Sequence, residues 1–555
     1  MFIRLHRQTQ RGKVYTSVQL CESYRDPERG GAPRNRVVVN LGPLEKLGMD
    51  AVRNLGKSCF RAAGETLKEC VAPSLVFARD FGHVHAAGGV WDKLKIGHAL
   101  DRAGIAGSAT FPAAELIRML VVNRLCDPCS KLALLDWLDS VHYGHAEKPE
   151  YQHLLRAMDH LIEVKDRAEP LIARRLLKDA GPLDLVFYDI TSTYFEGERS
   201  LMADDFRRFG YSRDHRDDRR QIVIGMVTTR EGIPLCHHVF AGNTVDKTTV
   251  ADVVRDLKKR FGFSRVLFVG DRGMISNANL GVLLDESLGF IVAHPLRRNA
   301  TASGVIERLA AHFDRESEEE QFLEEEREGV RFVVAYSKEI ADDAKKGREK
   351  RILKADAWIK EALRKLSHPT GIGRKPTPQG TYDRIRDRLR DRNLLGFYEV
   401  TSGGNKVGVK KDRKALAWEE KIDGLLMLET TDLALPAKEV VDRYKEMAEI
   451  ERGWRSLKST LLLRPVFHWT ERRIRAHVFV CVLALQLERW MRLKLRPVSV
   501  PRALSELARI KVGELELDGK KSLVVTRPTD EQKEWLASLG VPPIPSTLPE
   551  PARVV

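Results

Sequence analysis

The sequence predicts an α/β protein: a mixed sheet with helices, interrupted by a β-rich insertion and preceded by a β-hairpin and a helical region. Two observations support this prediction. The runs "LVFYD" (185–189) and "RVLFVGD" (265–271) are rich in aliphatic and aromatic residues, as buried strands are, and each ends at an aspartate. Between residues 183 and 297, the strand and helix patterns follow the order β-β-β-α-β-α-β. Such an order places helices on the faces of a mixed sheet.

The chain begins with β-rich segments. "KVYTSVQLCESY" and "RNRVVVNLG" flank "RDPERGGAP", whose Pro and Gly residues favour a turn, so we expect an N-terminal β-hairpin region over residues 1–75. Residues 76–180 carry helical periodicity, which is clearest in "FPAAELIRMLVVNRL". This block is basic enough to contact DNA, and we interpret it as a helical DNA-binding region. Basic helix faces that are only solvated are the alternative.

The segment 181–297 carries the strand order that contains both aspartates. Its first strand bears Asp189, a two-strand meander follows, and its fourth strand bears Asp271. This is the strand order of a ribonuclease-H-like domain. We therefore predict that residues 181–297 form the first part of a ribonuclease-H-like core.

The pattern becomes irregular after Pro295. We predict one insertion over residues 298–430, mixed in structure and rich in β near its end, with the acidic segment 315–329 as an exposed helix. Helical patterns return over residues 431–495, which we assign to the second part of the core. Residues 496–555 are expected to form a C-terminal tail with a helix, a hairpin at "DGKK" and a further helix.

The composition narrows the class of protein. The 555 residues include 93 Lys and Arg against 78 Asp and Glu, which gives a net charge of +15. A polyanion such as nucleic acid is the first partner to consider, and a basic enzyme without a nucleic-acid role is the alternative. Apolar runs fall short of the roughly 20 residues of a membrane span. The seven cysteines do not suggest a disulfide framework, so we expect a cytoplasmic protein and no membrane partner.

Asp189 and Asp271 end two strands that are expected to be neighbours in the sheet. Two carboxylates that lie within a few ångströms repel each other and raise each other's pKa, unless a cation lies between them. Hard divalent ions with oxygen ligands, Mg²⁺ or Mn²⁺, suit such a pair. A site of this kind usually needs a third carboxylate.

The segment "YKEMAEIERGWRSLK" (444–458) supplies a candidate third carboxylate, Glu451. In a continuous α-helix, residues spaced by seven return to within roughly 20° of each other, so Tyr444, Glu451 and Lys458 would share one face. Arg455 lies one turn after Glu451. This face suits a metal ligand beside a phosphate backbone, whereas an ordinary surface helix with a Glu451–Arg455 pair is the alternative.

Taken together, "YDITSTYF", "VGDRGM" and "YKEMAEIERGWRSLK" resemble the DDE transposases of bacterial insertion sequences. The resemblance is to the IS4-type superfamily and, within it, to the IS1634-like group. That superfamily carries the signature Tyr-x2-Arg-x3-Glu-x6-Lys, whose Tyr, Glu and Lys positions are occupied here by Tyr444, Glu451 and Lys458. Met447 occupies the arginine position, so Arg452 or Arg455 would have to replace that arginine.

The resemblance implies two-metal DNA chemistry by Asp189, Asp271 and Glu451 as catalytic residues and metal ligands. Asp189 would bridge two Mg²⁺ (or Mn²⁺) ions, and the other two carboxylates would hold one ion each. The residues that would bind DNA near the cleaved strand are Tyr444, Arg452, Arg455 and Lys458.

The same resemblance implies the partners of the protein. These are double-stranded DNA, both as terminal inverted repeats and as target, and a second copy of the chain in a homodimer that bridges the two transposon ends. Cleavage would free a 3′-OH that then attacks target DNA, with excision through a DNA hairpin. The protein would act in the bacterial cytoplasm, at the nucleoid when bound. A domesticated DNA-binding protein without catalysis and a ribonuclease-H-like nuclease without strand transfer are the alternatives.

Overall fold

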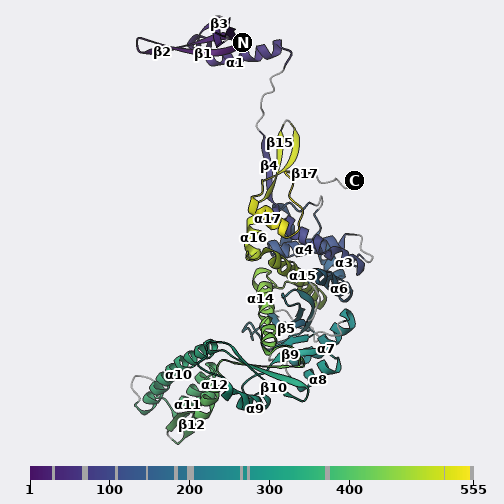
Figure 1. Cartoon of the computed structure of the whole chain (residues 1–555), viewed down its shortest axis with the longest axis vertical. Helices are drawn as coiled ribbons and strands as arrows, with labels where there is room; N and C mark the ends of the chain where they lie inside the picture. Colours follow the sequence, from purple (N-terminus) through teal and green to yellow (C-terminus); the bar gives the residue numbers. More distant parts are fainter. Residues whose placement is uncertain are drawn as a thin grey trace. The chain divides into compact units, whose positions relative to one another are not determined.

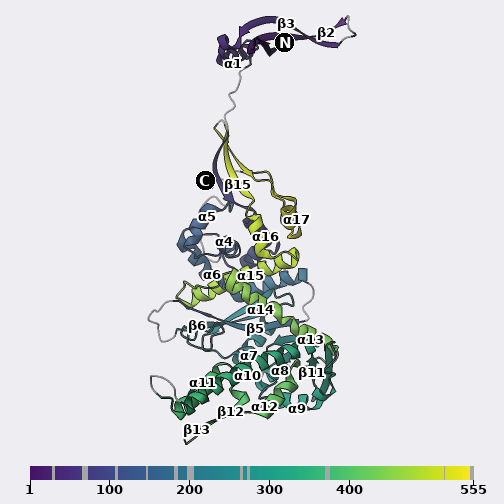
Figure 2. The ribbon, with the colours of Figure 1, turned by 90° about the vertical axis from the view of Figure 1, so that its left-hand side faces the viewer.

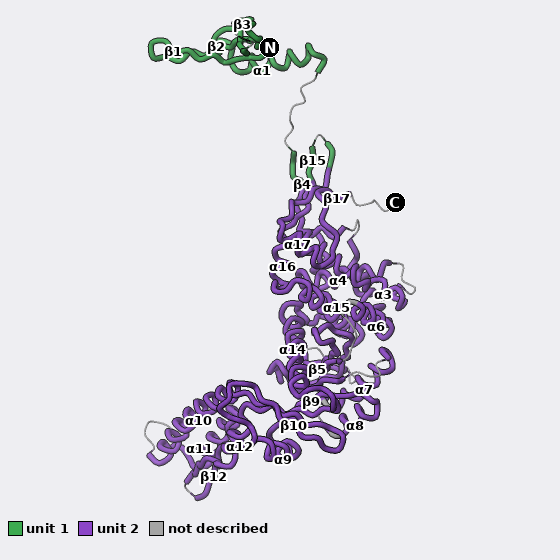
Figure 3. The backbone as a smooth tube through the Cα atoms, in the orientation of Figure 1, with its two compact units in different colours: residues 1–76, 515–521 green, residues 77–514, 522–555 purple. Residues whose placement is uncertain are grey.

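The structure is a computed structural model, and it describes residues 1–27, 30, 32–65, 73–106, 111–144, 148–180, 185–196, 205–262, 267–271, 276–368, 375–404, 406–517 and 519–549. The chain divides into two compact units (Figure 3). The first contains residues 1–76 and 515–521, and the second contains residues 77–514 and 522–555. Each unit is described by itself below.

The N-terminal part of the first unit is an antiparallel sheet followed by a helix (Figure 1, purple). Its elements are β1 (Phe2–Gln10), β2 (Lys13–Asp26), β3 (Ala32–Pro43) and α1 (Leu44–Ala62). The predicted hairpin is confirmed as β2 and β3, and β1 adds a third strand along the other edge of β2. Most side chains of this sheet are exposed, whereas Val18 and Cys21 are fully buried.

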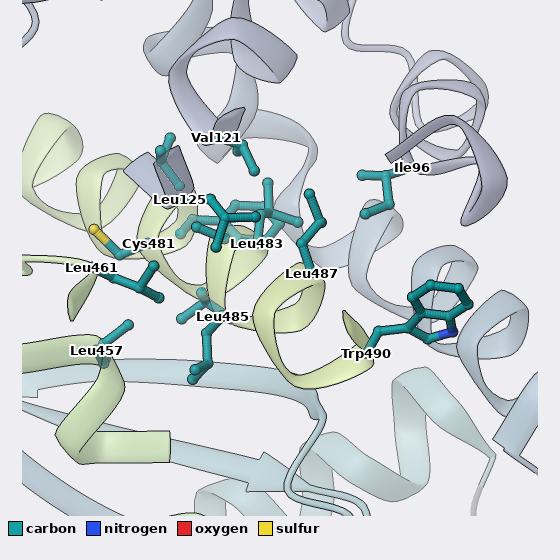
Figure 4. Close-up of a cluster of buried hydrophobic side chains, with 14 of the residues drawn as sticks. Ile96, Val121, Leu125, Leu457, Leu461, Cys481, Leu483, Leu485, Leu487 and Trp490 are labelled. Atoms are coloured by element: carbon teal, nitrogen blue, oxygen red, sulfur yellow. The ribbon is translucent and has the colours of Figure 1, made fainter. Parts of the chain in front are cut away.

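Helices dominate the beginning of the second unit. They are α2 (Gly82–Lys93), α3 (Ile96–Arg102), α4 (Ala113–Cys126), α5 (Ala133–Ser140) and α6 (Tyr151–Ala180). Of these, α2, α4 and α6 pack against α15 (Glu471–Leu495), whose run "VFVCVLALQL" is buried all round, as expected for an apolar helix inside a large core. Figure 4 shows Leu483 and Leu487 of α15 beside Val121 and Leu125 of α4. None of the helices in the described part of the chain is long and apolar enough to cross a membrane.

Lys131 and His477 form a polar pair inside this helical core. Lys131 Nζ lies 2.6 Å from His477 Nδ1, and His477 Nε2 lies 3.0 Å from the carbonyl oxygen of Leu463. Because a carbonyl oxygen can only accept, His477 donates through Nε2 and accepts from Lys131 at Nδ1. Burial lowers the pKa of Lys131 to about 7 and holds the pKa of His477 well below its ordinary value.

We expect this buried lysine to make stability depend on pH. The folded-state pKa of Lys131 is about 7, whereas a free lysine titrates near ~10.4. Above the folded-state pKa the unfolded chain binds a proton that the folded chain lacks, so the free energy of unfolding gained from this group rises with pH. The free energy of unfolding of Lys131→Met and of wild type is measured with urea at pH 7 and pH 10. The difference between the two proteins should change by about 2–4 kcal/mol between these pH values. The same substitution at exposed Lys354 should give a constant difference, and a constant difference for Lys131→Met would contradict the expectation.

The central sheet has eight strands in the order β10-β11-β14-β9-β8-β5-β6-β7. The strands that come from residues 181–297, the predicted first part of the core, are β5 (Leu185–Tyr194), β6 (Gln221–Thr228), β7 (Pro234–Ala241), β8 (Leu267–Gly270) and β9 (Gly289–Ala293). Strands β5, β8 and β9 are parallel, and β5, β6 and β7 form an antiparallel meander. With α7 (Asp246–Asp256) after β7 and α8 (Asn277–Asp285) after β8, the predicted order and the mixed sheet are confirmed.

The two faces of this sheet pack against different helices. Successive side chains of a strand point to opposite faces, and Phe187 accordingly belongs to the core that includes α15, whereas Val186 and Tyr188 belong to the core that includes α7 and α8. Figures 1 and 2 both show β5 between α14 on one side and α7 on the other. The alternation places Asp189 on the same face as Phe187.

The segment predicted as an insertion extends the sheet. Strand β14 (Leu425–Thr430) pairs antiparallel with β9, and β11 (Val330–Tyr336) and β10 (Gln321–Arg327) follow outward. The remaining elements of this segment are α9 (Ala300–Leu309), α10 (Lys338–Ser367), α11 (Pro378–Asp391), β12 (Tyr398–Gly403), β13 (Lys406–Lys411) and α12 (Arg413–Ile422). The prediction of an exposed helix over 315–329 is wrong, because residues 321–327 pair as strand β10 with β11.

The C-terminal part returns to the core. Its helices are α13 (Ala437–Lys445), α14 (Met447–Arg455), the π-helical turn η6 (Ser456–Thr460), α16 (Val500–Leu507) and α17 (Asp530–Ser538). Strands β15 (Lys511–Leu517), β16 (Lys520–Val525) and β17 (Thr547–Leu548) form a small sheet with β4 (Ser74–Asp80).

Candidate active site

Asp189 and Asp271 are neighbours at one place in the sheet. The parallel register of β5 and β8 pairs Tyr188 with Gly270, so the next residue on each chain segment is one of the two aspartates. Asp271 directly follows β8 and is exposed. Asp189 lies within β5, which continues to Tyr194 because the β-branched run after Asp189 pairs with β6. The sequence pattern had suggested that the strand ends at Asp189.

Both oxygens of the Asp189 carboxylate accept hydrogen bonds. The backbone N–H of Ile190 donates to Oδ1 at 2.7 Å, and the indole Nε1–H of Trp454 donates to Oδ2 at 2.9 Å. Burial, with a smaller contribution from the negative charge of Asp271, raises the pKa of Asp189 to about 6, although both hydrogen-bond donors act to lower it. A bound cation would relieve both effects, so this pair of carboxylates fits a divalent ion with oxygen ligands.

Helices α13 and α14 reach the two aspartates through different side chains. The Tyr444 hydroxyl on α13 donates to Asp271 Oδ1 at 3.4 Å, and Trp454 on α14 donates to Asp189. Trp454 is also buried in the main core. Its hydrogen bond to Asp189 has no local signal in the sequence, because the two residues lie 265 positions apart.

The helix that carries Glu451 is not continuous. An interruption at Glu446 separates α13 from α14, and the π-helical turn η6 follows α14 directly. The expected single face through Tyr444, Glu451 and Lys458 assumed an uninterrupted α-helix, so that geometric argument does not hold over the whole segment.

Glu451 itself is exposed on α14, three residues before Trp454. Its carboxylate does not form a closed cluster with the two aspartates. Among the described residues, the three side chains whose possible metal-ligand atoms all lie within 4.8 Å of one another are Cys236, His238 and Asp256. Glu451 and the two aspartates do not form such a group. The structure therefore brings Asp189 and Asp271 together and places Glu451 on the helix that contacts Asp189.

Glu449 anchors the other side of α14. Arg489, which is fully buried on α15, donates to the backbone carbonyl of Glu449 and lies 3.3 Å from Glu449 Oε2. The Arg452 guanidinium also pairs with the Glu449 carboxylate.

Met447, at the signature arginine position, packs against the main core. Of the two candidate replacements for that arginine, Arg452 is thus paired within the protein, and Arg455 is exposed.

Lys458 contacts an acidic residue from a distant loop. Its Nζ donates to Asp214 Oδ1 at 3.0 Å, and Arg464 Nη1 lies 3.1 Å from Asp214 Oδ2. Burial lowers the pKa of Lys458, and Asp214 opposes that effect. Asp214 lies in the segment "RRFGYSRDHRDDRR" (207–220), whose mixture of arginine and aromatic residues is a sequence pattern that can indicate a nucleic-acid contact.

No curated protein matches the chain. A solved structure that matches is the cryo-EM structure of a piggyBac transposase synaptic complex with hairpin DNA, with 10% identity and a TM-score of 0.38, over 72% of this chain and 70% of that chain.

Two family models match directly. Residues 3–70 match the model described as IS1634 family transposase, N-terminal domain, and residues 181–487 match the model described as transposase DDE domain. The second match spans more than half of the 555 residues and includes Asp189, Asp271 and Glu451. The resemblance inferred from the motifs is confirmed: the chain belongs to the DDE transposases of bacterial insertion sequences, in the IS1634 group.

Proposed function

We propose that this transposase cleaves the DNA backbone at transposon ends and joins the freed 3′-OH to target DNA, with Asp189, Asp271 and Glu451 as ligands of two divalent ions, Mg²⁺ or Mn²⁺. When bound, such ions lower the pKa of the attacking water and neutralise charge on the reacting phosphate. The observation that carries the proposal is the pairing of Asp189 with Asp271 by strand register, beside helix α13, which bonds to Asp271, and helix α14, which bonds to Asp189.

The hydrogen bonds of Asp189 support its role as the shared ligand. Ile190 N–H and Trp454 Nε1–H each occupy one acceptor direction on a different oxygen. A carboxylate has about four lone-pair directions, so each oxygen retains one for a cation. The two donors also fix the orientation of the carboxylate. Glu451, exposed and close in sequence to Trp454, completes the proposed ligand set.

We further propose that Tyr444, Arg452, Arg455 and Lys458 position DNA phosphates beside the carboxylates. Arg455 is exposed, whereas Arg452 and Lys458 would have to leave Glu449 and Asp214 to reach a phosphate. The net charge of +15 supports a polyanionic partner. A homodimer that bridges both transposon ends, acting at the bacterial nucleoid, completes the proposal.

The test is incubation of the protein with duplex DNA that carries the terminal inverted repeats of its own element, with Mg²⁺. Nicked, hairpin and joined products are separated on denaturing gels. Joined products with target DNA support the proposal. Nicks alone would indicate a nuclease without strand transfer, and binding without nicks would indicate a DNA-binding protein without catalysis; either result would refute the proposed strand transfer.

Replacing Trp454 with phenylalanine should slow cleavage by about 10-fold while DNA binding stays within twofold, as expected for the loss of one hydrogen bond to a charged group. Without the indole N–H, the ionised form of Asp189 loses a stabilising donor, so its pKa should rise above the present value of about 6. The acid limb of the pH–rate profile should therefore move to higher pH.

Trp490→Phe is the matched control, because this tryptophan is also buried but lies on α15. It should leave the pH–rate profile in place. An unchanged acid limb in Trp454→Phe, with wild-type cleavage, would show that the hydrogen bond has no part in the reaction.

A further inference from the structure

Asp214 lies between two cationic side chains beside the candidate active site. Lys458 Nζ is 3.0 Å from its Oδ1, and Arg464 Nη1 is 3.1 Å from its Oδ2. All three side chains are largely buried, with 17% exposure for Asp214 and Lys458 and 24% for Arg464. One carboxylate thus balances two cations, which leaves an excess of one positive charge at this point.

One oxygen of the Asp214 carboxylate lacks a hydrogen bond. Asp214 Oδ2 is buried and accepts no hydrogen bond from the described residues, although the Arg464 guanidinium is close. A buried acceptor without a hydrogen bond is unfavourable. An anion with more oxygen atoms than a carboxylate would use the donors of Lys458 and Arg464 better, and a phosphodiester is such an anion.

Arg464 is held in place independently of Asp214. Its guanidinium lies over the ring of Tyr194, 4.6 Å from the ring centroid. Tyr194 is the last residue of β5, the strand that carries Asp189. If Asp214 withdrew, Arg464 would therefore remain beside the strand, as a preformed contact for an incoming anion.

The loop that carries Asp214 is fastened close to the catalytic strand. The backbone N–H of Arg213 donates to Ser192 Oγ on β5 at 3.1 Å, and the positive charge of Arg213 acts on the Asp189 carboxylate. Earlier in the same loop, Phe209 and Tyr211 are exposed, with 53% and 79% of their surfaces accessible. Lys458 and Arg464 thus lie beside the proposed metal ligands, and the loop that carries Asp214 also presents exposed aromatic side chains.

We infer that Lys458 and Arg464 form a subsite for a backbone phosphate of the bound DNA, and that Asp214 occupies this subsite until DNA replaces it. The inference rests on the proposed function, because it assigns a DNA contact to the same site. It adds Arg464 as a phosphate contact and Asp214 as an internal competitor for the phosphate.

The experiment measures DNA affinity by fluorescence anisotropy with a labelled duplex of scrambled sequence over a series of salt concentrations. Asp214→Asn should bind about three- to tenfold more tightly than wild type, and its slope of log affinity against log salt should be steeper by about one, because the freed cations then hold counterions that DNA releases. Asp214→Glu, which restores the carboxylate, should return both values toward wild type.

Asp218→Asn is the matched control. It removes the same charge from the same loop, but Asp218 is 61% exposed and pairs with Arg216 and Arg219. A change of less than twofold is expected. An equal gain in both variants would overturn the inference, because general electrostatics would then explain the gain.

A second variant covers the case in which Asp214→Asn fails to fold, as judged by its thermal unfolding. Arg464→Gln should weaken binding and lower the salt slope by about one. Wild-type affinity and slope in Arg464→Gln would overturn the inference. Wild-type protein that does not bind duplex DNA at all would instead refute the proposed function.

Discussion

Replacing Asp189 with alanine should abolish DNA cleavage and leave DNA affinity within about twofold of wild type. The substitution removes the carboxylate that the parallel register places beside Asp271. In the proposed function, its loss removes the shared ligand and the negative charge that would hold the ions at the reacting phosphate. Loss of such preorganised electrostatic stabilisation costs about 10²–10³-fold or more in rate. Cationic side chains elsewhere still contact phosphates, so binding persists.

The measurement is single-turnover cleavage of terminal DNA in Mg²⁺, with DNA affinity measured on the same preparation. Asp189→Asn is the companion variant, because it keeps the volume of the side chain and an oxygen that can accept from Trp454. Asp252→Ala, at an aspartate 69% exposed on α7, is the control and should cleave normally. Cleavage retained by Asp189→Ala would eliminate the carboxylate mechanism.

Glu449 and Glu451 should respond in opposite ways to the same substitution. Glu451 is exposed, so Glu451→Gln should leave the free energy of unfolding nearly unchanged. It should reduce cleavage by about 10²–10³-fold, because it removes a proposed metal ligand. Glu449 pairs with Arg452 and with the fully buried Arg489. Glu449→Gln should therefore destabilise the protein by about 1–3 kcal/mol, because buried Arg489 loses a charged partner.

Urea unfolding and single-turnover cleavage on both variants separate the two roles. Glu449→Gln should retain cleavage per folded molecule at temperatures well below its unfolding transition. If both variants cleave at the wild-type rate, Glu451 is not a metal ligand. If Glu451→Gln unfolds as readily as Glu449→Gln, Glu451 is structural.

Much of the central sheet could be predicted because its signals are local. The apolar runs before Asp189 and Asp271 and the order of strands and helices suffice to place both aspartates on adjacent strands. The segment 315–329 shows the limit of local signals. Its eight glutamates suggested an exposed helix, but pairing with β11 makes part of it the edge strand β10. Tertiary pairing overrides intrinsic propensity at such a position.

The rest of the site depends on contacts between residues far apart in the chain. The bond from Trp454 to Asp189 spans 265 positions, and the contact from Lys458 to Asp214 spans 244. Periodicity within one segment carries no information about such partners. Met447 illustrates the same point, because its departure from the family signature is accounted for only by the core against which it packs.

The pairing of β14 with β9 limits how freely these transposases can exchange parts. Thr430 and Leu428 of β14 lie opposite Ile291 and Ala293 of β9, so the segment between the second aspartate and the glutamate shares a hydrogen-bonded seam with the catalytic half of the molecule. Deleting the whole segment would expose β9 as a new sheet edge, which invites aggregation. A shortened or chimaeric enzyme would need to keep β14, or supply another strand in register, whereas α10, α11 and the β12–β13 hairpin have their own small core and are the better place for a graft.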